Sequence, residues 1–522
     1  MFAVLAVAAS LAASACSSSG AGTGRFGADA ERGVLRVGLE RPQSLDPAQA
    51  RYVADFLVVD QLFDGLTAYD PATLEVRPSL ASRWEVSPNQ RIWTFHLRTD
   101  ATFSNGRAIT SEDVKYTLDR IAARGSGSPA APQLDAVIGF KEVNSEGTLD
   151  HMVGVITPDP ATVQIALVHP LSVLAEILAS PAFGIVPREA VEAAPPAPAF
   201  AEQPVGSGPF MFRSRNVDVL RLMPSPGADV ELRGIDVYFG SDGEEAYAAF
   251  LRGQLDWTAV PAERVEEVVR DRGRDSFRPY PAQLFYGFNL DNPKFADVRF
   301  REAIVRAVDR QAIVDNVYGG RVRLATGVVA AGVPGHQPDP CGERCRYDPA
   351  RARALVAEVF GNRPVPTVNI DFDDDPTQEA VARSMAAGLE AVGIPAGLRP
   401  HAYTEYLKFA ASGQQELFQM AWIAPYASPD AFLAPLFYSG KDDNIVSFNS
   451  PDVDAFIRAG RETGDRAAAM AAYQAAEQLV MAHMVVLPIA QYETHTLVAD
   501  RVRDLPMSAF GTFDASRARL SG

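Results

Sequence analysis

Hydrophobic and polar residues alternate from Ile92 to Leu97, as expected for a strand with one buried face. The alternation places Ile92, Thr94 and His96 on one face of the strand. The other face carries Trp93, Phe95 and Leu97 and so holds both aromatic residues. We expect the aromatic side to lie in the core. A short extended run at Trp84–Val86 comes before it, and Trp84 is also expected to be a core residue.

Turn and capping signals flank this strand. Ser87–Arg91 is predicted to be a turn, in which Pro88 fixes one backbone angle and Asn89 tolerates the left-handed conformation. Asn105–Gly106 is a second turn signal. Thr110 is expected to cap a helix that carries acidic residues in its first turn, where they suit the helix dipole.

The same alternation of strands and helices continues to the end of the chain without a fixed sequence repeat. We expect further strands at Val34–Leu39, 153–157, 162–167, Phe210–Arg213, 234–239, 255–260, Leu284–Leu290, Val368–Phe372, Gln419–Ile423 and Val485–Ala490. We expect further helices at 52–66, 171–179, 243–252, 298–317, 346–361, 376–393, 428–438 and 466–482. The pattern predicts an α/β fold in at least two lobes.

Two short segments carry more specific expectations. The strand–helix–strand order over 234–260 is typical of a βαβ unit with parallel strands. In Pro204–Phe210, two glycines indicate either positive backbone angles or a close approach of two backbone segments. A phosphate-binding loop would need a lysine after those glycines, and none is present.

Composition narrows the classes of function. The chain has 522 residues, 47% of them hydrophobic, which is enough for two or more domains. A net charge of −17 argues against nucleic acid or an anionic membrane surface as the main partner. Neither a G-x-S-x-G nor an H-E-x-x-H motif occurs, and the acidic run Asp371–Asp375 lacks calcium-loop spacing. We therefore expect no enzyme activity, no cofactor and no metal.

The first residues resemble an export signal. Residues 1–15 are apolar and end in small residues, which favours a secretory signal over a membrane span. Cys16 follows directly, and 17–24 is a Ser/Gly/Ala linker, so the segment resembles a lipoprotein signal with a lipidated cysteine and a tether over 16–32. Ala13 stands where leucine is usual, and no basic residue precedes Arg25. The alternative is an ordinary secreted protein with an incidental cysteine.

The other two cysteines, Cys341 and Cys345, lie close together in a Pro/Gly-rich loop. In an exported protein, a local disulfide is the first interpretation, and its loop is so short that the stabilisation should be modest. A metal site is the alternative, although two thiolates fall short of four zinc ligands and His336 is not at a familiar spacing.

Several blocks occur in the order found in one known family. They are Pro78–Trp84, Trp93–Arg98, Phe103–Arg120, Pro204–Phe210, Asn289–Arg310, Tyr347–Pro349, Gly388–Ile394 and Trp422–Leu433. As an ordered set they resemble the bacterial extracellular solute-binding proteins of family 5, the peptide- and nickel-type receptors of ABC importers. The resemblance implies a two-lobed periplasmic-binding-protein fold of type II, with the first lobe at 33–70, 204–285 and 491–522, its accessory subdomain at 71–203 and the second lobe at 286–490.

The resemblance also implies a function. The chain would be a monomeric extracytoplasmic lipoprotein, anchored to the outer face of the cell membrane or periplasmic. It would capture a peptide or peptide-like solute between its lobes and deliver it to an ABC permease. Two alternatives stay open: a non-transport lipoprotein that uses the fold for envelope assembly or regulation, and a receptor for a sugar, a glycolipid fragment or a metal chelate.

Candidate ligand-binding residues follow from that picture, because in α/β sheets the crevice lies outside the carboxyl ends of the strands. They are Gln43 and Ser44 after the first strand, Phe285, Tyr286 and Asn289 where the chain crosses between lobes, and Trp422, Ala424, Pro425 and Tyr426 after a later strand. Phe285 fits the core equally well, and Trp422 is the strongest candidate.

One position departs from the family pattern. Peptide-binding members usually carry an aspartate in a W-x-x-D motif after this strand, where it pairs with the ligand's α-amino group. Pro425 occupies that position here and offers neither a charge nor a backbone N–H. Asp430 lies five residues further on, and we expect it to cap a helix or face solvent. We therefore predict that a free peptide N-terminus is not anchored in the usual way.

Overall fold

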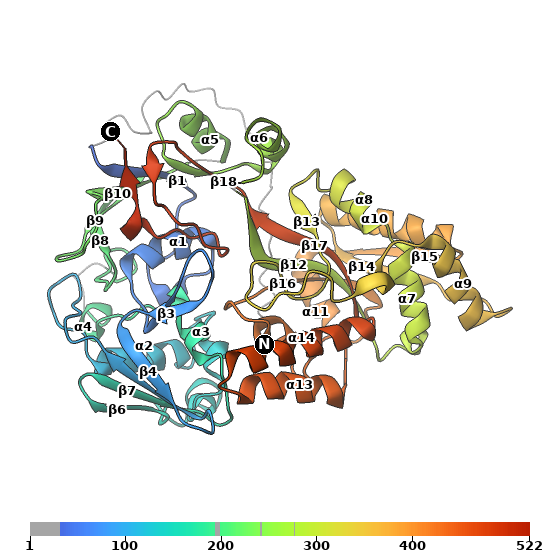
Figure 1. Cartoon of the computed structure of the whole chain (residues 1–522), viewed down its shortest axis with the longest axis horizontal. Coiled ribbons are helices and arrows are strands. Elements are labelled where there is room, and N and C mark those ends of the chain that lie inside the picture. Colours follow the sequence, from blue (N-terminus) through green and yellow to red (C-terminus); the bar gives the residue numbers. More distant parts are fainter. Residues whose placement is uncertain (1–31, 194–198, 241–242, 276, 522) are drawn as a thin grey trace. The chain divides into compact units, whose positions relative to one another are not determined.

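The computed structural model describes residues 32–193, 199–240, 243–275 and 277–521. The predicted signal segment and Cys16 lie outside the described residues. The chain divides into two compact units (Figure 1). The smaller unit is Pro279–Glu493, and the larger unit combines the described residues up to Arg278 with those from Thr494 onward.

A six-stranded mixed sheet forms the centre of the larger unit. Its strand order is β18 (Thr496–Val498), β11 (Trp257–Ala259), β1 (Val34–Leu39), β10 (Gly234–Phe239), β9 (Val219–Pro224) and β8 (Phe210–Arg215). β1 pairs in parallel with both β10 and β11, and α5 (Gly243–Leu251) connects those two strands. The predicted βαβ arrangement is therefore confirmed.

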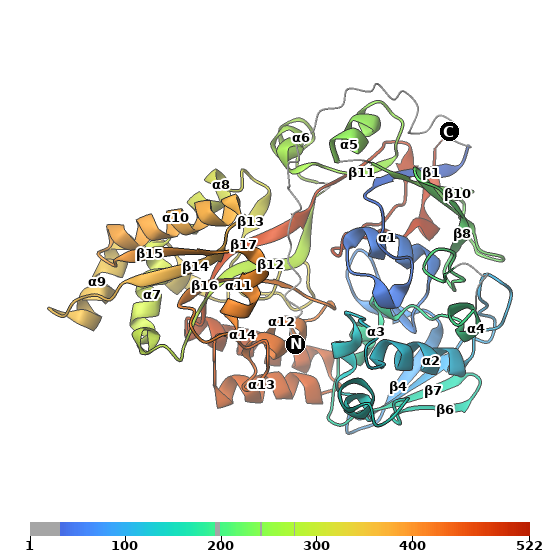
Figure 2. The ribbon, with the colours of Figure 1, turned by 180° about the vertical axis from the view of Figure 1, so that it is seen from behind.

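The two faces of this sheet bury different residues because successive side chains of a strand alternate. Leu35, Val37 and Ile235 belong to the main core, together with side chains of α1 (Val53–Leu62). Tyr238 on the opposite face packs with side chains from α5 and from α6 (Val265–Arg272). Figure 2 shows α5 and α6 beside β11, at one end of the sheet.

A separate four-stranded antiparallel sheet lies within the larger unit. Its order is β4 (Ala81–Val86), β5 (Ile92–Leu97), β7 (Thr162–Ala166) and β6 (Val155–Asp159), and α2 (Ser111–Ala122) contacts β6 and β7. On β5, Trp93, Phe95 and Leu97 are buried, which confirms the predicted alternation. Trp84 is only half-buried, with its ring centroid 6.3 Å from that of Phe95.

The predicted turn lies between β4 and β5, and its left-handed residue is the one after Asn89. Gln90, not Asn89, takes the left-handed conformation, with a φ of 55°. The Asn89 Oδ1 accepts hydrogen bonds from the Ser87 hydroxyl and the Arg91 N–H. Since that side chain bridges the residues on either side, the reversal falls one position later.

The two glycines of Pro204–Phe210 serve a close backbone approach. A Cβ on Gly206 would overlap the carbonyl oxygen of Leu62, and one on Gly208 would lie 2.6 Å from the Leu62 carbonyl carbon. The carbonyl of Leu62 in α1 also accepts a hydrogen bond from the Gly208 N–H. Of the two readings of these glycines, the close approach is confirmed.

The remaining elements of the larger unit are short. They are β2 (Thr67–Tyr69) paired with β3 (Val76–Pro78), β19 (Val502–Arg503) paired with β20 (Arg519–Leu520), α3 (Leu174–Leu178) and α4 (Arg188–Val191). Thr110 and Asp113 form the capping box of α2, which confirms the predicted helix start.

The smaller unit has its own six-stranded mixed sheet. Its order is β13 (Val322–Leu324), β17 (Val486–Thr494), β12 (Arg278–Phe288), β16 (Leu417–Ile423), β14 (Val368–Asp373) and β15 (Ala396–His401). β12 is antiparallel to β16, whereas β14 is parallel to both β15 and β16. Its helices are α7 (Val298–Ala307), α8 (Arg310–Asn316), α9 (Pro349–Phe360), α10 (Pro376–Ala391), α11 (Tyr403–Ala410), α12 (Asp430–Phe437), α13 (Pro451–Glu462) and α14 (Arg466–Ala482).

One predicted helix of this unit is wrong. The stretch 298–317 is two helices, α7 and α8, because Val308 is extended and Asp309 starts a new helix. The Asp309 carboxylate accepts a hydrogen bond from the Ala312 N–H, as an N-cap does. By contrast, α14 begins at the predicted residue, capped by Asp465.

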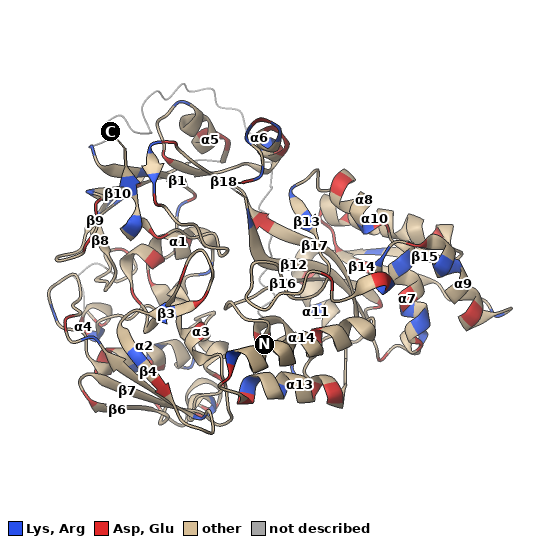
Figure 3. Ribbon diagram, in the orientation of Figure 1, with Lys and Arg blue, Asp and Glu red and all other residues tan. Residues whose placement is uncertain are grey.

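Both units combine helices with mixed sheets, so the predicted α/β class is confirmed. Acidic and basic residues are interspersed along the helices of both units (Figure 3). Over the stretch the structure describes, none of the helices is sufficiently long and apolar to cross a membrane.

Candidate functional site

Trp422, the strongest predicted ligand residue, lies near the end of β16. Its side chain is only about 5% exposed, and its indole N–H donates to the carbonyl oxygen of Ala431 in α12 at 2.7 Å. In this conformation the indole fixes the start of α12. The next residue on the same face, Ala424, is also buried and donates its N–H to Pro281 O at 2.8 Å.

Asp430, at the first turn of α12, forms a buried ion pair. Its side chain is 0% exposed, and Arg461 of α13 donates from Nε and Nη2 to its two oxygens at 2.7 and 2.8 Å. The Tyr426 hydroxyl donates to the same carboxylate at 2.8 Å. The expectation that Asp430 caps a helix or faces solvent is therefore wrong, because α13 brings a guanidinium against it.

The electrostatics of this pair are set by burial and by Arg461. Burial alone would raise the pKa of Asp430, but the Arg461 charge and its hydrogen bonds outweigh burial and hold that pKa below its usual value. Burial and the adjacent carboxylate raise the pKa of Tyr426 well above 10. The carboxylate is thus ionised and already fully engaged by protein donors.

The loop between β16 and α12, residues 424–429, therefore offers no charged side chain to a ligand. Pro425 is half-buried and has no N–H, and the Tyr426 hydroxyl already donates to Asp430. No acidic residue occurs from 424 to 429. A ligand ammonium group that approaches this loop would meet no uncommitted carboxylate from 424 to 430, a segment that the structure describes in full.

The predicted residues of β12 fall on opposite faces of the sheet. β12 and β16 pair with Gln283 opposite Trp422 and with Tyr286 opposite Gln419. Because side chains alternate along a strand, Phe285 shares a face with Trp422 while Tyr286 lies on the other face. Both Phe285 and Tyr286 are 0% exposed. The structure thus does not bring these predicted residues into one site.

Asn289, just beyond β12, holds neighbouring loop segments together through side-chain hydrogen bonds. Its amide donates to the carbonyl oxygens of Gly413 and Gln415 at 3.0 and 2.9 Å, and its Oδ1 accepts from the Asp291 N–H. The side chain is buried, and these bonds fix the loop that leads into β16. All of its hydrogen-bonding groups are in use in this conformation.

A cluster of buried polar groups surrounds Tyr286. Tyr406 of α11 donates to Gln419 O at 2.6 Å, and the Gln419 amide joins both the N–H and the carboxylate of Asp373. Burial raises the pKa of Asp373 and, far above 10, that of Tyr286. Among the described residues, the Tyr286 hydroxyl has no hydrogen-bond partner.

Sequence reasoning found only Tyr286 of this cluster. The signal it overlooked was the presence of glutamine in strands that are otherwise apolar, as at Gln283, Gln419 and Gln491. A buried amide requires partners, so such positions mark polar networks within a core. The partners themselves come from distant segments and cannot be read from spacing.

In the larger unit, the loop with Gln43 and Ser44 is organised around one carboxylate. Asp55 in α1 accepts from the backbone N–H groups of Gln43, Ser44, Arg51 and Tyr52. The Ser44 hydroxyl accepts from the Asp46 N–H. Gln43 itself is exposed and free to contact a solute, whereas the main-chain donors of this loop are already used.

The structure joins Cys341 and Cys345 in a disulfide, with their Cα atoms 5.7 Å apart. His336 contacts Val329 O through its Nδ1 at 2.9 Å. In the described part of the chain, no three or more His, Cys, Asp or Glu side chains are grouped to hold a metal ion.

Comparison with known proteins defines the class. Residues 75–444 match the bacterial extracellular solute-binding proteins, family 5 (middle region), and the chain belongs to that family. The unliganded open form of the murein tripeptide-binding protein MppA superimposes with a TM-score of 0.85, covering 94% of this chain and 98% of that one at 23% identity. The predicted family and fold are therefore confirmed.

Two relatives of similar identity to this chain are named for different ligands. The periplasmic murein peptide-binding protein MppA of Escherichia coli is 25% identical, over 90% of this chain and 89% of its own. A probable deoxycholate-binding periplasmic protein of the same organism, YgiS, is 26% identical, over 89% of each chain. Sequence similarity at this level assigns the family, whose members bind solutes, and leaves the ligand open.

Proposed function

We propose that this protein is the extracytoplasmic substrate-binding component of an ABC importer and that it captures a peptide or peptide-like solute for a membrane permease. Family membership over residues 75–444 supports the transport role. Several relatives are named for peptide binding, including MppA and the oligopeptide-binding protein OppA of Escherichia coli. That the solute is held between two lobes stays a prediction from the family resemblance.

The choice of ligand rests on the loop after β16, which has no charged side chain and is followed by a carboxylate that Arg461 neutralises. Pro425 has no charge, and the nearest carboxylate, Asp430, is paired with Arg461 and with Tyr426. We therefore propose a solute that does not need a carboxylate anchor for a free α-amino group at this loop. Blocked or modified peptides satisfy that condition.

A receptor for a non-peptide solute is the second candidate. The relative YgiS, which is as similar in sequence as MppA, is named for deoxycholate binding, so an apolar or anionic small molecule is compatible with this family. Native mass spectrometry of protein purified from its own host distinguishes the two candidates by the mass of the retained ligand. A peptide mass supports the first candidate, whereas a sterol, sugar or chelate mass supports the second.

Calorimetry tests the proposed lack of an amine anchor. The wild-type protein is titrated with di- to pentapeptides, each with a free N-terminus and in N-acetylated form. Submicromolar binding that needs the free amine would refute the proposal. Pro425→Asp supplies the missing carboxylate and should strengthen binding of free peptides by about tenfold or more, since a charged hydrogen bond contributes about 1.5–3 kcal/mol. Pro425→Asn is the matched neutral control.

We also propose that the chain is exported and lipidated at Cys16, and that it acts as a monomer. Residues 1–15 and the small residues before Cys16 support export and lipidation, and the monomeric state is carried over from the family resemblance. Mass spectrometry of the mature N-terminal peptide tests it directly. A diacylglyceryl-modified Cys16 at the new N-terminus is the expected result, and an unmodified Cys16 within a longer peptide would contradict it.

A further inference from the structure

A hollow of about 270 Å³ lies at one end of the larger unit's sheet. The strands β1, β8, β9 and β10 line it through Val34, Arg213, Ser214, Arg221, Leu222, Arg233, Gly234 and Asp236. The cross-strand register places Arg221 opposite both Ser214 and Asp236, on the face that α5 and α6 cover at the other end. This end of the face thus presents polar side chains where the other end presents apolar ones.

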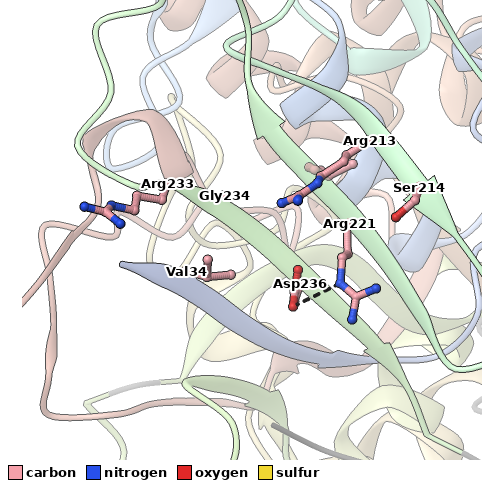
Figure 4. Close-up of a pocket in the computed structure, with 8 residues that line it drawn as sticks. Val34, Arg213, Ser214, Arg221, Arg233, Gly234 and Asp236 are labelled. Carbon is pink, nitrogen blue, oxygen red and sulfur yellow. Dashed lines mark ion pairs between the residues drawn. The ribbon is translucent and has the colours of Figure 1, made fainter. Parts of the chain in front are cut away.

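Backbone irregularities shape the hollow. The pairing of β8 with β9 shifts register between Phe212 and Ser214, so Arg213 sits at a bulge, a device that redirects a side chain. Gly234 lets β10 lie close to β9, because a Cβ at that position would be 2.5 Å from Leu222 O. Figure 4 shows Arg221 beside Asp236, Arg213 above Gly234, and Arg233 extending outward from the opposite side.

The charges of the hollow are not balanced. Arg221 contacts Asp236 at 3.5 Å, but the side chains of Arg213 and Arg233 form no ion pair or hydrogen bond with the residues that the structure describes. On the neighbouring strand β1, Arg36 lies opposite Asp236, and it shares the carboxylate of Asp256 with Arg501. Three arginines and one aspartate therefore line the hollow, in a protein whose net charge is −17.

The guanidinium fork matches phosphate oxygens in geometry, so such a cluster is suited to a phosphate group more than to a diffuse negative surface. The volume of the hollow is many times the space that one water molecule needs. The hydroxyl of Ser214 adds a neutral hydrogen-bond donor. Two uncommitted arginines beside a lining hydroxyl are suited in chemistry to an anion of phosphate character.

The position of the hollow favours one source of phosphate. Val34, the first residue of β1, lines the hollow, and it follows the N-terminal segment by which we propose the protein is tethered. From Cys16 to Val34 the chain can span at most about 60 Å even when fully extended. A lipid anchor at Cys16 would therefore hold β1 within about 60 Å of the membrane surface, where phospholipid headgroups are a concentrated source of phosphate.

We propose that this arginine-lined hollow binds the phosphate of an anionic phospholipid headgroup and so orients the larger unit on the membrane. The inference uses the proposed anchor to choose the source of phosphate. Its test does not, because it is carried out on the full chain with Cys16→Ser, in which no lipid can be attached.

The experiment is vesicle co-sedimentation at 50 and 150 mM salt. The Cys16→Ser protein should bind vesicles that contain phosphatidylglycerol in phosphatidylcholine and should not bind pure phosphatidylcholine. Adding Arg213→Gln and Arg233→Gln should weaken that binding about tenfold or more, with an unchanged melting temperature because both side chains are unpaired. The matched control adds Arg252→Gln and Arg270→Gln, two exposed arginines elsewhere in the same unit, and should bind as the parent does.

Each other outcome overturns the proposal. Equal loss in the test and control variants would show that binding depends only on total charge. Binding that survives Arg213→Gln and Arg233→Gln would place the contact elsewhere. If vesicles are not bound but calorimetry detects inorganic phosphate, and the two substitutions abolish that heat, the hollow is a site for free phosphate and the lipid source is wrong.

Discussion

Removal of the buried partner of Arg461 should destabilise the smaller unit severely. Asp430→Asn keeps the shape of the side chain but leaves the guanidinium, whose side chain is 19% exposed, without its countercharge. Breaking a buried ion pair by removing one partner costs about 3–5 kcal/mol, because the remaining charge stays desolvated. Arg461→Met should cost at least as much, since Asp430 is 0% exposed.

The same reasoning predicts strong coupling between the two residues. Asp430→Asn with Arg461→Met leaves no uncompensated charge, so the double variant should be destabilised by about 2 kcal/mol less than the sum of the single variants, or better. Glu379→Gln provides the control, because Glu379 and Arg383 form an exposed i,i+4 pair with side chains 46% and 66% exposed. That substitution should cost about 0.5 kcal/mol or less.

Hydrogen exchange measured by mass spectrometry across a urea series is the appropriate assay, because peptides from α12 and α13 report the smaller unit separately from the larger one. A loss below about 1 kcal/mol for Asp430→Asn, equal to that of the control, would refute the buried pair. It would also reopen Asp430 as an anchor for a ligand amine.

Three further predictions concern stability. Burial raises the pKa of Glu477 to about 7, and an acid whose folded pKa is raised stabilises the fold most below its unfolded pKa and loses that contribution as the pH rises through 7. The free energy of unfolding, reported by peptides from α14 across a urea series, should therefore fall by up to about 3 kcal/mol between pH 5 and 8. Glu477→Gln should flatten this pH dependence, and an unchanged slope in that variant would contradict the prediction. Asp309→Ala should lower the free energy of unfolding by about 1 kcal/mol, because α8 loses its cap. Thermal melting measures this loss with Gln311→Ala as the control, and a loss seen in the control but not in Asp309→Ala would count against the cap. Replacing Cys341 and Cys345 by serine should lower the free energy of unfolding by about 2 kcal/mol or less, because the closed loop is short, and a larger loss in urea melts would show that the disulfide holds more than this loop.

Local patterns predicted most of the secondary structure. The strand at Ile92–Leu97 and the helix after Asp465 follow from alternation and from a capping residue, both of which are encoded within a few positions. The single helix predicted over 298–317 failed because the apolar stripe continues across Val308, although Asp309 carried a usable capping signal. Periodicity alone does not reveal a change of helix direction.

The site was harder to predict because its contacts are long-range. The motif position of Pro425 was visible from the sequence, but nothing near Asp430 indicates that Arg461, 31 residues later, neutralises it. Strand alternation separates Phe285 from Tyr286, but which of them shares a face with Trp422 depends on the register between β12 and β16, strands more than a hundred residues apart. Such contacts are set by tertiary packing, so residue type and spacing do not specify them.

The most direct measurement is a calorimetric titration of the wild-type protein with the same peptides in free and N-acetylated form, alongside Pro425→Asp. The account predicts that acetylation changes the wild-type affinity by less than about threefold and weakens binding to Pro425→Asp by about tenfold or more. Submicromolar wild-type binding of free peptides that acetylation abolishes would contradict the claim that this solute-binding protein lacks an amine anchor after β16.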